Sequence, residues 1–474
     1  MAVVHTRAPV RVQPRVIPRK PGAERALSSD IKQGEPRAQE LQATPKPVDH
    51  PDRRQLNEEV HARPFAHLEA PERATHLALL TGEAGVETDL AHLNKLCERY
   101  QIAPPMAEQN HCLLDFGDFR LKWERHTEFT SYTFFADGPL PDDPFKNSAV
   151  EQLPRDWVES IPGQVLSAVK VVVEPRSAPK RAPEAATKFM SSANFAAAQC
   201  SGGAAMAFMD FAMDAQGYGR VFVRDHSLRP RQAGRLVQRL MEIETYRMMA
   251  LLAFPLARSR GGELTRMGNR LTDITQRMTE LRALEDERQL LVDITALSAD
   301  VERVAAETSY RFSASSAYYA LVERRIAELR EQRLEGYQTF KEFMERRLTP
   351  AMRTCDAVRD RLETLSRRVT RAGQLLRTRV DIQVEGQNRD LLASMDRRAK
   401  LQLRLQETVE GLSLAAITYY AVGLVNYVTE GAVEAGLGVP VDLITAVAVP
   451  VVAITAFIAV RRVRRRIQKA EGGG

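Results

Sequence analysis

The stretch GLSLAAITYYAVGLVNYVTEG, residues 411–431, decides the fold class of this chain. It contains 19 consecutive uncharged residues at 411–429, and 18 more follow at 443–460. A helix that crosses a membrane needs roughly 20 apolar residues, with a lower limit near 17. Two such runs joined by a short loop predict a transmembrane hairpin within 411–461, with helices at about 412–429 and 443–460. The alternative is a hydrophobic helical hairpin that caps a soluble bundle.

Charged residues flank both runs and predict their orientation. The loop between the runs holds three acids and no base: Glu430, Glu434 and Asp442. Before the first run stand four basic residues, Arg397, Arg398, Lys400 and Arg404. The sequence RRVRRRIQK follows the second run. Because Lys and Arg are retained on the cytoplasmic side of spanning helices, we expect the N-terminus and the basic tail of 462–474 to be cytoplasmic.

Upstream, the chain divides into a tail and a domain. Residues 1–50 are rich in Pro, Arg and Ala without periodic apolar positions, which predicts a disordered tail. Residues 51–255 contain short apolar runs typical of strands, such as THLALL and QVLSAVKVVVEP, and amphipathic segments such as GVETDLAHLNKLCERY. AAMAFMDFAMDAQGYGRVFVRD predicts a hairpin that turns at Gln216 and Gly217. We therefore expect a cytoplasmic domain with mixed α and β structure, an α+β fold.

Residues 256–410 predict a stalk of long helices. The segments between Pro255 and Pro350 and between Pro350 and Pro440 contain no proline, which would interrupt a helix. A single helix could cover 351–411. Apolar residues in 4-3-4-3-4 spacing, the pattern of a coiled-coil seam, are Val358, Leu362, Leu365, Val369, Ala372 and Leu376. Since such a seam needs partner helices, we expect a homo-oligomer.

Composition narrows the class of partner. The net charge is +6 over 474 residues, and the basic residues are mostly interleaved with acids, as on solvated helix faces. We therefore expect no nucleic-acid partner, and the lipid bilayer and further copies of the chain are the predicted partners. The cysteines match no zinc spacing and are typical of a reducing compartment; they are Cys97, Cys112, Cys200 and Cys355.

The segment LNEEVHARPF brings together residues that can bind ions. Glu58, Glu59, His61 and Arg63 lie close together, and carboxylate and imidazole groups are metal ligands. An anion or metal site is one interpretation, and a capped surface turn whose charges pair locally is the other. The chain contains no Gly-rich phosphate loop and no H-E-x-x-H pattern, and a Ser-His-Asp set cannot be read from it. We expect no enzyme and no cofactor other than a divalent cation, while the metal itself stays unknown.

Polar residues in the first run admit two interpretations. Inside a bilayer such groups usually face protein or water. One interpretation is a pore whose wall includes Tyr420 and Gly423, with Asn426 near the outer mouth. The acids Glu430 and Glu434 would then raise the local concentration of cations. The other interpretation is hydrogen bonding between helices and close packing through small residues.

Two stretches of the chain resemble a bacterial family. They are LNEEVHARPF and TRVDIQVEGQNRDLLASMDRRAKLQLRLQETVEGLSLAAITYYAVGLVNYV. The family is that of the uncharacterised membrane-anchored proteins, the domain of unknown function three-four-two-two. The resemblance runs from about residue 50 to the C-terminus. It implies a protein of the bacterial inner (plasma) membrane and brings no established activity.

The layout is also similar to that of CorA-type magnesium transporters. Those proteins have a cytoplasmic α/β domain, a long stalk helix that continues into the first membrane helix, a short outer loop and a second membrane helix. Their signature, Gly-Met-Asn, ends the first membrane helix. Here the corresponding place reads VGLVNYV, with two residues between Gly423 and Asn426.

Two functions therefore remain open. The first hypothesis is a CorA-like, homo-oligomeric cation channel or transporter, favoured by the polar residues in the first run and the acidic loop. The second is a membrane-tethered scaffold or sensor without transport activity. It is favoured by the different Gly–Asn spacing and by the lack of acids inside the two runs.

Overall fold

The computed structural model describes residues 47–54, 56–57, 64–81, 86–106, 109–179, 183–280, 283–434, 436 and 440–471. Most of the tail that we expect to be disordered, 1–46, lies outside these residues. The chain divides into two compact units, Met1–Ala62 and Arg63–Gly474. All the strands and helices named below belong to the second unit.

A nine-stranded sheet forms the core of this unit. Its strands are β1 (Glu72–Leu80), β2 (His111–Asp115), β3 (Arg120–Arg125), β4 (Phe129–Asp137), β5 (Gln164–Glu174), β6 (Ala196–Cys200), β7 (Ala205–Met209), β8 (Gly219–Asp225) and β9 (Gln332–Arg333). The order is β2-β3-β4-β1-β5-β8-β7-β6-β9. Neighbouring strands are antiparallel except β5 and β8, whose parallel pairing joins the two halves of the sheet. The predicted mixed α and β structure is confirmed, as is the hairpin of β7 and β8.

Helices cover one face of the sheet. They are α5 (Pro230–Leu251), the last turns of α7 (Leu284–Leu329) and the first turns of α8 (Phe340–Glu434). Successive side chains of a strand point to opposite faces. Val171 of β5 and Val223 of β8 accordingly share one apolar cluster with Leu240 of α5, Leu329 of α7 and Phe343 of α8.

The opposite face is covered in two separate parts. Over the β2-β3-β4-β1 side lie α2 (Val86–Arg99), the short helix α3 (Arg155–Glu159) and the 3-10 turn η2 (Ala149–Gln152). Over the other half lie α4 (Pro183–Thr187) and the loop that carries Phe145. The sheet is therefore buried on both sides, which explains why eight of the nine residues of β1 are buried.

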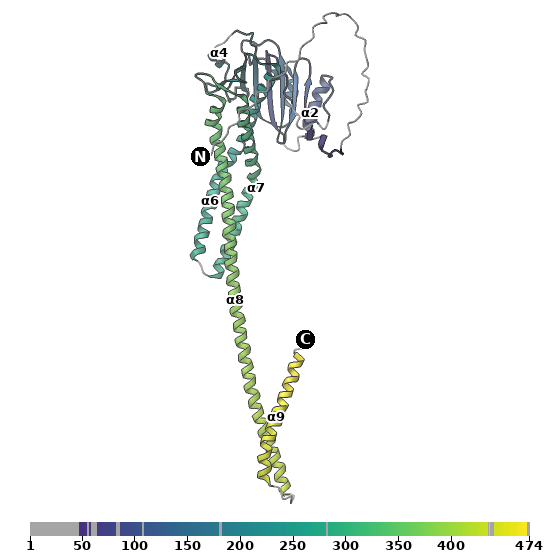
Figure 1. The fold of residues 1–474 in the computed structure, drawn as a ribbon, viewed down its shortest axis with the longest axis vertical. Helices are drawn as coiled ribbons and strands as arrows, with labels where there is room; N and C mark the ends of the chain where they lie inside the picture. The colour runs from purple at the N-terminus through teal and green to yellow at the C-terminus, as the bar shows by residue number, and fades with distance from the viewer. Residues whose placement is uncertain are drawn as a thin grey trace, which may run out of the picture. The chain divides into compact units, whose positions relative to one another are not determined.

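Three helices form a bundle next to the sheet. α6 (Ala253–Glu280) and α7 pack along the first half of α8, as Figure 1 shows. The predicted seam of α8 is buried in this bundle, in one apolar cluster that includes Leu362, Leu365, Val369 and Leu376 of α8, Leu271 of α6 and Leu297 of α7. The seam thus packs against helices of the same chain. It no longer provides a reason to expect a homo-oligomer.

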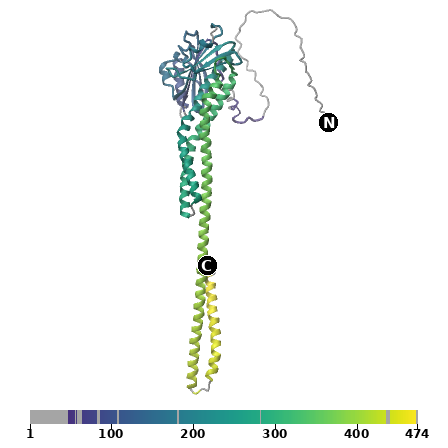
Figure 2. The same cartoon turned by 90° about the vertical axis from the view of Figure 1, so that its left-hand side faces the viewer.

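The helix α8 is continuous over 95 residues and is about 140 Å long at 1.5 Å per residue. It contains the predicted helix of 351–411 and the first apolar run, and Pro350 lies inside it. α9 (Val441–Glu471) contains the second apolar run and packs against the last turns of α8 (Figure 2). Both helices are long and apolar enough to cross a membrane.

The packing shows no division near residue 255. β9 pairs with β6, and the first turns of α8 belong to the main apolar cluster of the sheet. Two segments after residue 256, β9 and the first turns of α8, therefore pack on the sheet. The rest of α8 extends beyond the sheet (Figure 1). The predicted stalk is thus built from α6, α7 and α8, but α7 and α8 are also part of the domain core.

Candidate functional site

The sequence-predicted ion site cannot be placed. Glu58, Glu59, His61 and Arg63 lie outside the residues that the structure describes. Within the described residues, no group of three or more His, Cys, Asp or Glu side chains is arranged to hold a metal ion. A metal site at this segment therefore stays a prediction.

The residues predicted to line a pore all lie on the last turns of α8, and Asn426 is the informative one. Its Nδ2 donates a hydrogen bond of 2.9 Å to Oε1 of Glu430, one turn further on. Its Oδ1 accepts a hydrogen bond of 3.1 Å from Oγ1 of Thr445 on α9. The amide therefore joins the two apolar helices, as the interpretation of hydrogen bonding between helices expects.

The other predicted pore residues have few contacts. Tyr420 is 72% exposed, Glu430 is exposed, and a Cβ at Gly423 would have no neighbour within 4 Å. Glu434 is the last residue of α8. A pore lined by these residues stays a prediction, and the side chain of Glu434 lies outside those that the structure describes.

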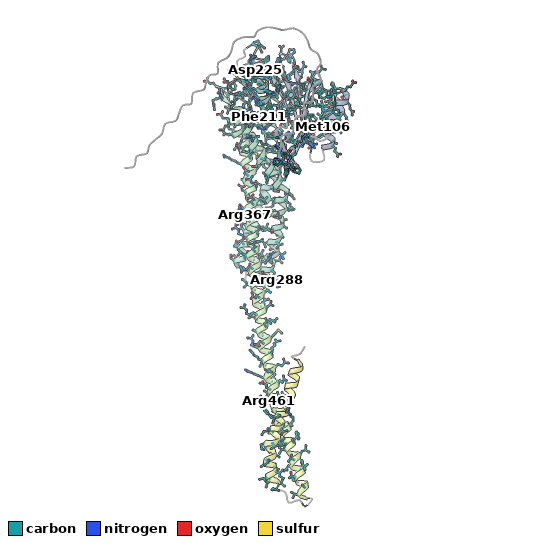
Figure 3. The ribbon with its side chains drawn as sticks, turned by 45° about the vertical axis from the view of Figure 1, so that its right-hand side comes forward. Met106, Phe211, Asp225, Arg288, Arg367 and Arg461 are labelled. Carbon is teal, nitrogen blue, oxygen red and sulfur yellow. The ribbon has the colours of Figure 1, made fainter. Side chains whose placement is uncertain are left out.

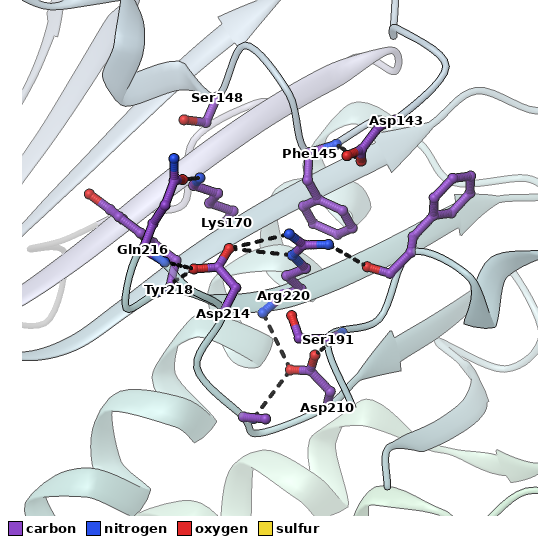
Figure 4. Close-up of polar contacts among 12 residues, drawn as sticks. Asp143, Phe145, Ser148, Lys170, Ser191, Asp210, Asp214, Gln216, Tyr218 and Arg220 are labelled. Atoms are coloured by element: carbon purple, nitrogen blue, oxygen red, sulfur yellow. Dashed lines mark hydrogen bonds and ion pairs between the residues drawn. The ribbon is translucent and has the colours of Figure 1, made fainter. Parts of the chain in front are cut away.

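A polar network lies on the sheet face opposite α5, where β5 and β8 run in parallel (Figure 4). Lys170 and Arg220 are paired neighbours on these strands. Arg220 donates to Oδ2 of Asp214 at 3.4 Å and to the carbonyl oxygen of Phe189 at 3.0 Å. Lys170 Nζ donates to Oε1 of Gln216 at 2.5 Å. The network holds the turn between β7 and β8 against the sheet.

Asp214 is the carboxylate at the centre of this network. Burial alone would raise the pKa of Asp214, but the backbone N–H groups of Tyr218 and Gln216, with Lys170 and Arg220, outweigh burial and lower it. The carboxylate is therefore ionised at neutral pH and its charge is compensated locally. We infer a structural role, because its hydrogen-bonding capacity is already used by the chain.

Next to this network lies a cleft of about 300 Å³. It is lined by residues of the 192–194 segment, the loop after β7, the end of α5 and the first turns of α8: Ser192, Asn194, Asp210, Phe211, Ala212, Arg247, Leu251, Phe343, Met344, Arg347 and Leu348. Figure 3 shows Phe211 in the region of the sheet, far from Arg461 on α9. No sequence motif marks this cleft, because its residues come from four segments that lie far apart in the chain.

Two phenylalanine rings and two guanidinium groups form a stack in the cleft. The rings of Phe211 and Phe343 are stacked with their centroids 4.5 Å apart. The guanidinium of Arg247 lies 5.7 Å from the centroid of Phe211, and that of Arg347 lies 5.3 Å from the centroid of Phe343. Cations over aromatic faces are held by the quadrupole of the ring. The cleft thus combines an aromatic surface with two guanidinium groups, of which that of Arg247 is paired with Glu244.

Comparison with known proteins gives one match. Neither the curated proteins nor the solved structures include one that matches the chain. The family described as Protein of unknown function (DUF3422) matches residues 48–467, nearly the whole length. The chain therefore belongs to the DUF3422 family.

Proposed function

We propose that this protein is a membrane-tethered scaffold or sensor, in which α8 and α9 anchor the sheet domain to the cytoplasmic face of the bacterial inner membrane. The observation that carries the proposal is the exposure of the two apolar runs. In both helices the most apolar 18-residue window is not buried inside the structure at all. A core helix of a soluble protein would bury it.

The exposed side chains are large and apolar. Among them are Leu412, Ile417, Leu424, Val428, Leu443, Val447, Ile454 and Phe457. Removing one such side chain from water is worth roughly 1.5–3 kcal/mol. Contiguous apolar patches of more than a few hundred Å² are rare on soluble monomers and mark interfaces with membranes or partners. A bilayer would cover all sides of the pair at once.

The part of α8 before the first apolar run supports a role as a spacer. Side chains of α8 are buried in the bundle up to Val380, and nearly all of those at 381–410 are exposed. Thirty residues of helix correspond to about 45 Å. A tether of this length would hold the bundle and the sheet domain well clear of the lipid surface, where they could meet other proteins.

Tethering is favoured over cation transport by the hydrogen bonds of Asn426. Transport through a pore at this position would use the amide oxygen of Asn426 to replace part of the hydration of a cation. That oxygen accepts a hydrogen bond from Thr445, and the amide nitrogen donates to Glu430. Both ends of the side chain thus have partners within one chain.

Cysteine labelling tests the anchor. In a Cys112→Ser background, Ala435→Cys in the loop should react with an impermeant maleimide on intact spheroplasts. Gln468→Cys should react only after the membrane is opened. Met213→Cys, which replaces a side chain that is 76% exposed in the sheet domain, is the control and should behave like Gln468→Cys. Recovery of the protein in the soluble fraction without detergent would contradict the proposal.

Ion flux separates the tether from a channel. Purified protein in liposomes that contain a magnesium-sensitive dye should show no flux above that of empty liposomes. Asn426→Ala and Thr445→Ala should each loosen the helical pair, with a coupling energy of about 0.6 kcal/mol in a double-mutant cycle. Flux by the wild type that Asn426→Leu abolishes without altering folding would instead support the transport hypothesis.

A further inference from the structure

We propose that the cleft between the loop after β7 and the first turns of α8 binds a small organic anion, a carboxylate or phosphate carried on a compact apolar skeleton. Neither the family nor the membrane anchor assigns a ligand to this cleft. The proposal stands on the charge, the apolar lining and the backbone of the cleft, and only the choice of a solute over a lipid rests on the proposed membrane anchor.

Among the residues that the structure describes, the cleft offers one unpaired guanidinium group, that of Arg347, to a ligand. In the described part of the chain, the exposed guanidinium of Arg347 has no hydrogen-bond or ion-pair partner and only rests on Phe343. Arg247 is paired with Glu244 through Nε and Nη2, and no partner of its Nη1 is found among the described residues. Guanidinium groups bind carboxylates and phosphates through paired hydrogen bonds.

The one acid in the lining, Asp210, uses its carboxylate to accept hydrogen bonds from the chain. Asp210 is 2% exposed, and its carboxylate already accepts hydrogen bonds from three backbone N–H groups. These belong to Ser191 at 2.7 Å, Ala212 at 3.3 Å and Arg220 at 3.5 Å. The bonds direct the carboxylate into the loop, so that it shapes the cleft wall instead of meeting a ligand.

The rest of the lining suits a carbon skeleton. Phe211, Leu251, Phe343, Met344 and Leu348 contribute apolar surface beside the two arginines. Clefts of this size that are largely apolar, with a few convergent polar groups, are typical of small-molecule sites. Ser192 and Asn194 add polar groups to the lining.

The backbone at Phe211 is strained in a way that favours a site. Its φ is +51°, in the left-handed region that bulky side chains rarely adopt. Such strain costs on the order of 1–3 kcal/mol and gathers at ligand clamps and active sites. Here the strained conformation places the Phe211 ring on Phe343 and under Arg247.

The position of the cleft indicates a solute and not a lipid. Leu348 in the cleft and Gly411 at the start of the first apolar run are about 95 Å apart along α8, at 1.5 Å per residue. A headgroup in the bilayer that α8 enters cannot reach this site. A ligand bound here would touch both the sheet loops and the first turns of α8.

Calorimetric titration of the full chain in nanodiscs tests the proposal. The probes are benzoate and phenyl phosphate, with benzyl alcohol as the neutral analogue and inorganic phosphate as the anion without a skeleton. We expect the wild type to bind at least one of the two organic anions, and more tightly than benzyl alcohol or inorganic phosphate. Arg347→Ala should weaken this binding by about 10-fold or more, because a charge-assisted hydrogen bond is lost.

Arg346→Ala is the matched control, because Arg346 is the exposed neighbour on α8, carries the same charge and does not line the cleft. It should bind the anion within about twofold of the wild type, since rim charges outside a site contribute little. Equal thermal stability of the two variants shows that both are folded. Failure of both organic anions to bind the wild type would overturn the proposal. So would equal affinity of Arg347→Ala and Arg346→Ala, or equal affinity of the wild type for benzyl alcohol.

Discussion

Leu376→Asp should unfold the end of the three-helix bundle, whereas Leu375→Asp should leave it folded. The two leucines are consecutive on α8, yet Leu376 is 0% exposed and Leu375 is 64% exposed. Loss of buried leucine packing alone costs about 2–5 kcal/mol. The aspartate adds the further cost of an unpaired charge among the apolar side chains of α6, α7 and α8.

Hydrogen exchange of the full chain in detergent measures this effect. Amides of α6 and α7 should lose protection in Leu376→Asp and keep it in Leu375→Asp. The loss should not depend on protein concentration, because the partners of Leu376 belong to the same chain. A loss of protection that is reversed at high protein concentration would show instead that the seam packs between chains.

The sequence predicted this buried face but not its partner. The 4-3-4-3-4 spacing reports which side of α8 is apolar, and that side is indeed buried. The same spacing arises whether the partner is a second copy or another helix of the chain. Arg379 closes the intrachain bundle, with Nη2 placed 2.8 Å from Oε1 of the buried Glu287 on α7. A pairing between residues so far apart in the chain leaves no local pattern.

The sheet illustrates the same limit. Strands such as THLALL could be read from continuous apolar runs, and the β7–β8 hairpin from its Gly-containing turn. The parallel pairing of β5 with β8 and the two-residue strand β9 depend on contacts between distant segments. The boundary that we expect at 255 stays a prediction, and the packing of β9 and the first turns of α8 on the sheet could not be read from sequence for the same reason.

Of the two candidate sites, the sequence identified the residue Asn426 but not the cleft at Phe211. Asn426 could be identified from sequence as a polar group in an apolar run. Whether its amide faces a pore or bonds to Thr445 depends on how α8 and α9 face each other. The cleft at Phe211 could not be found, because the left-handed backbone of a phenylalanine has no sequence signal. Arg347 looks like any exposed arginine of a charged helix until Phe343 and Phe211 are placed beside it.

Acid should destabilise the sheet domain through His76. This histidine on β1 is 5% exposed, and its ring nitrogens are hydrogen-bonded to Oγ1 of Thr133 on β4 at 2.8 Å and to Oγ1 of Thr245 on α5 at 3.0 Å. Burial, with a smaller contribution from Lys122, lowers its pKa from 6.5 to about 3. The neutral ring thus links the sheet to the helix that covers it.

The sign of the effect follows from proton binding. Between pH 6.5 and about 3, the unfolded chain binds a proton at His76 that the folded chain does not, so stability falls as pH falls through this window. The loss attributable to His76 approaches about 1.4 kcal/mol for each pH unit. Glu72 acts in the opposite direction: burial, partly offset by Arg120, raises its pKa to about 7, so its contribution is present below pH 4.5 and is lost toward pH 7.

Comparison of the wild type with His76→Asn isolates the histidine, because the contribution of Glu72 is present in both proteins and cancels in the difference. The asparagine will lower stability at neutral pH by removing part of a buried side chain. On acidification from pH 6.5 to 4.5, however, the difference in unfolding free energy should shift by about 2–3 kcal/mol in favour of His76→Asn.

Urea unfolding followed by tryptophan fluorescence measures the unfolding free energy at each pH, since Trp123 and Trp157 are both buried in the sheet domain. His226→Asn, at an exposed histidine, should run parallel to the wild type. If His76→Asn also runs parallel to the wild type, then His76 is protonated in the folded state as readily as in the unfolded chain, and the neutral bridge between Thr133 and Thr245 is wrong.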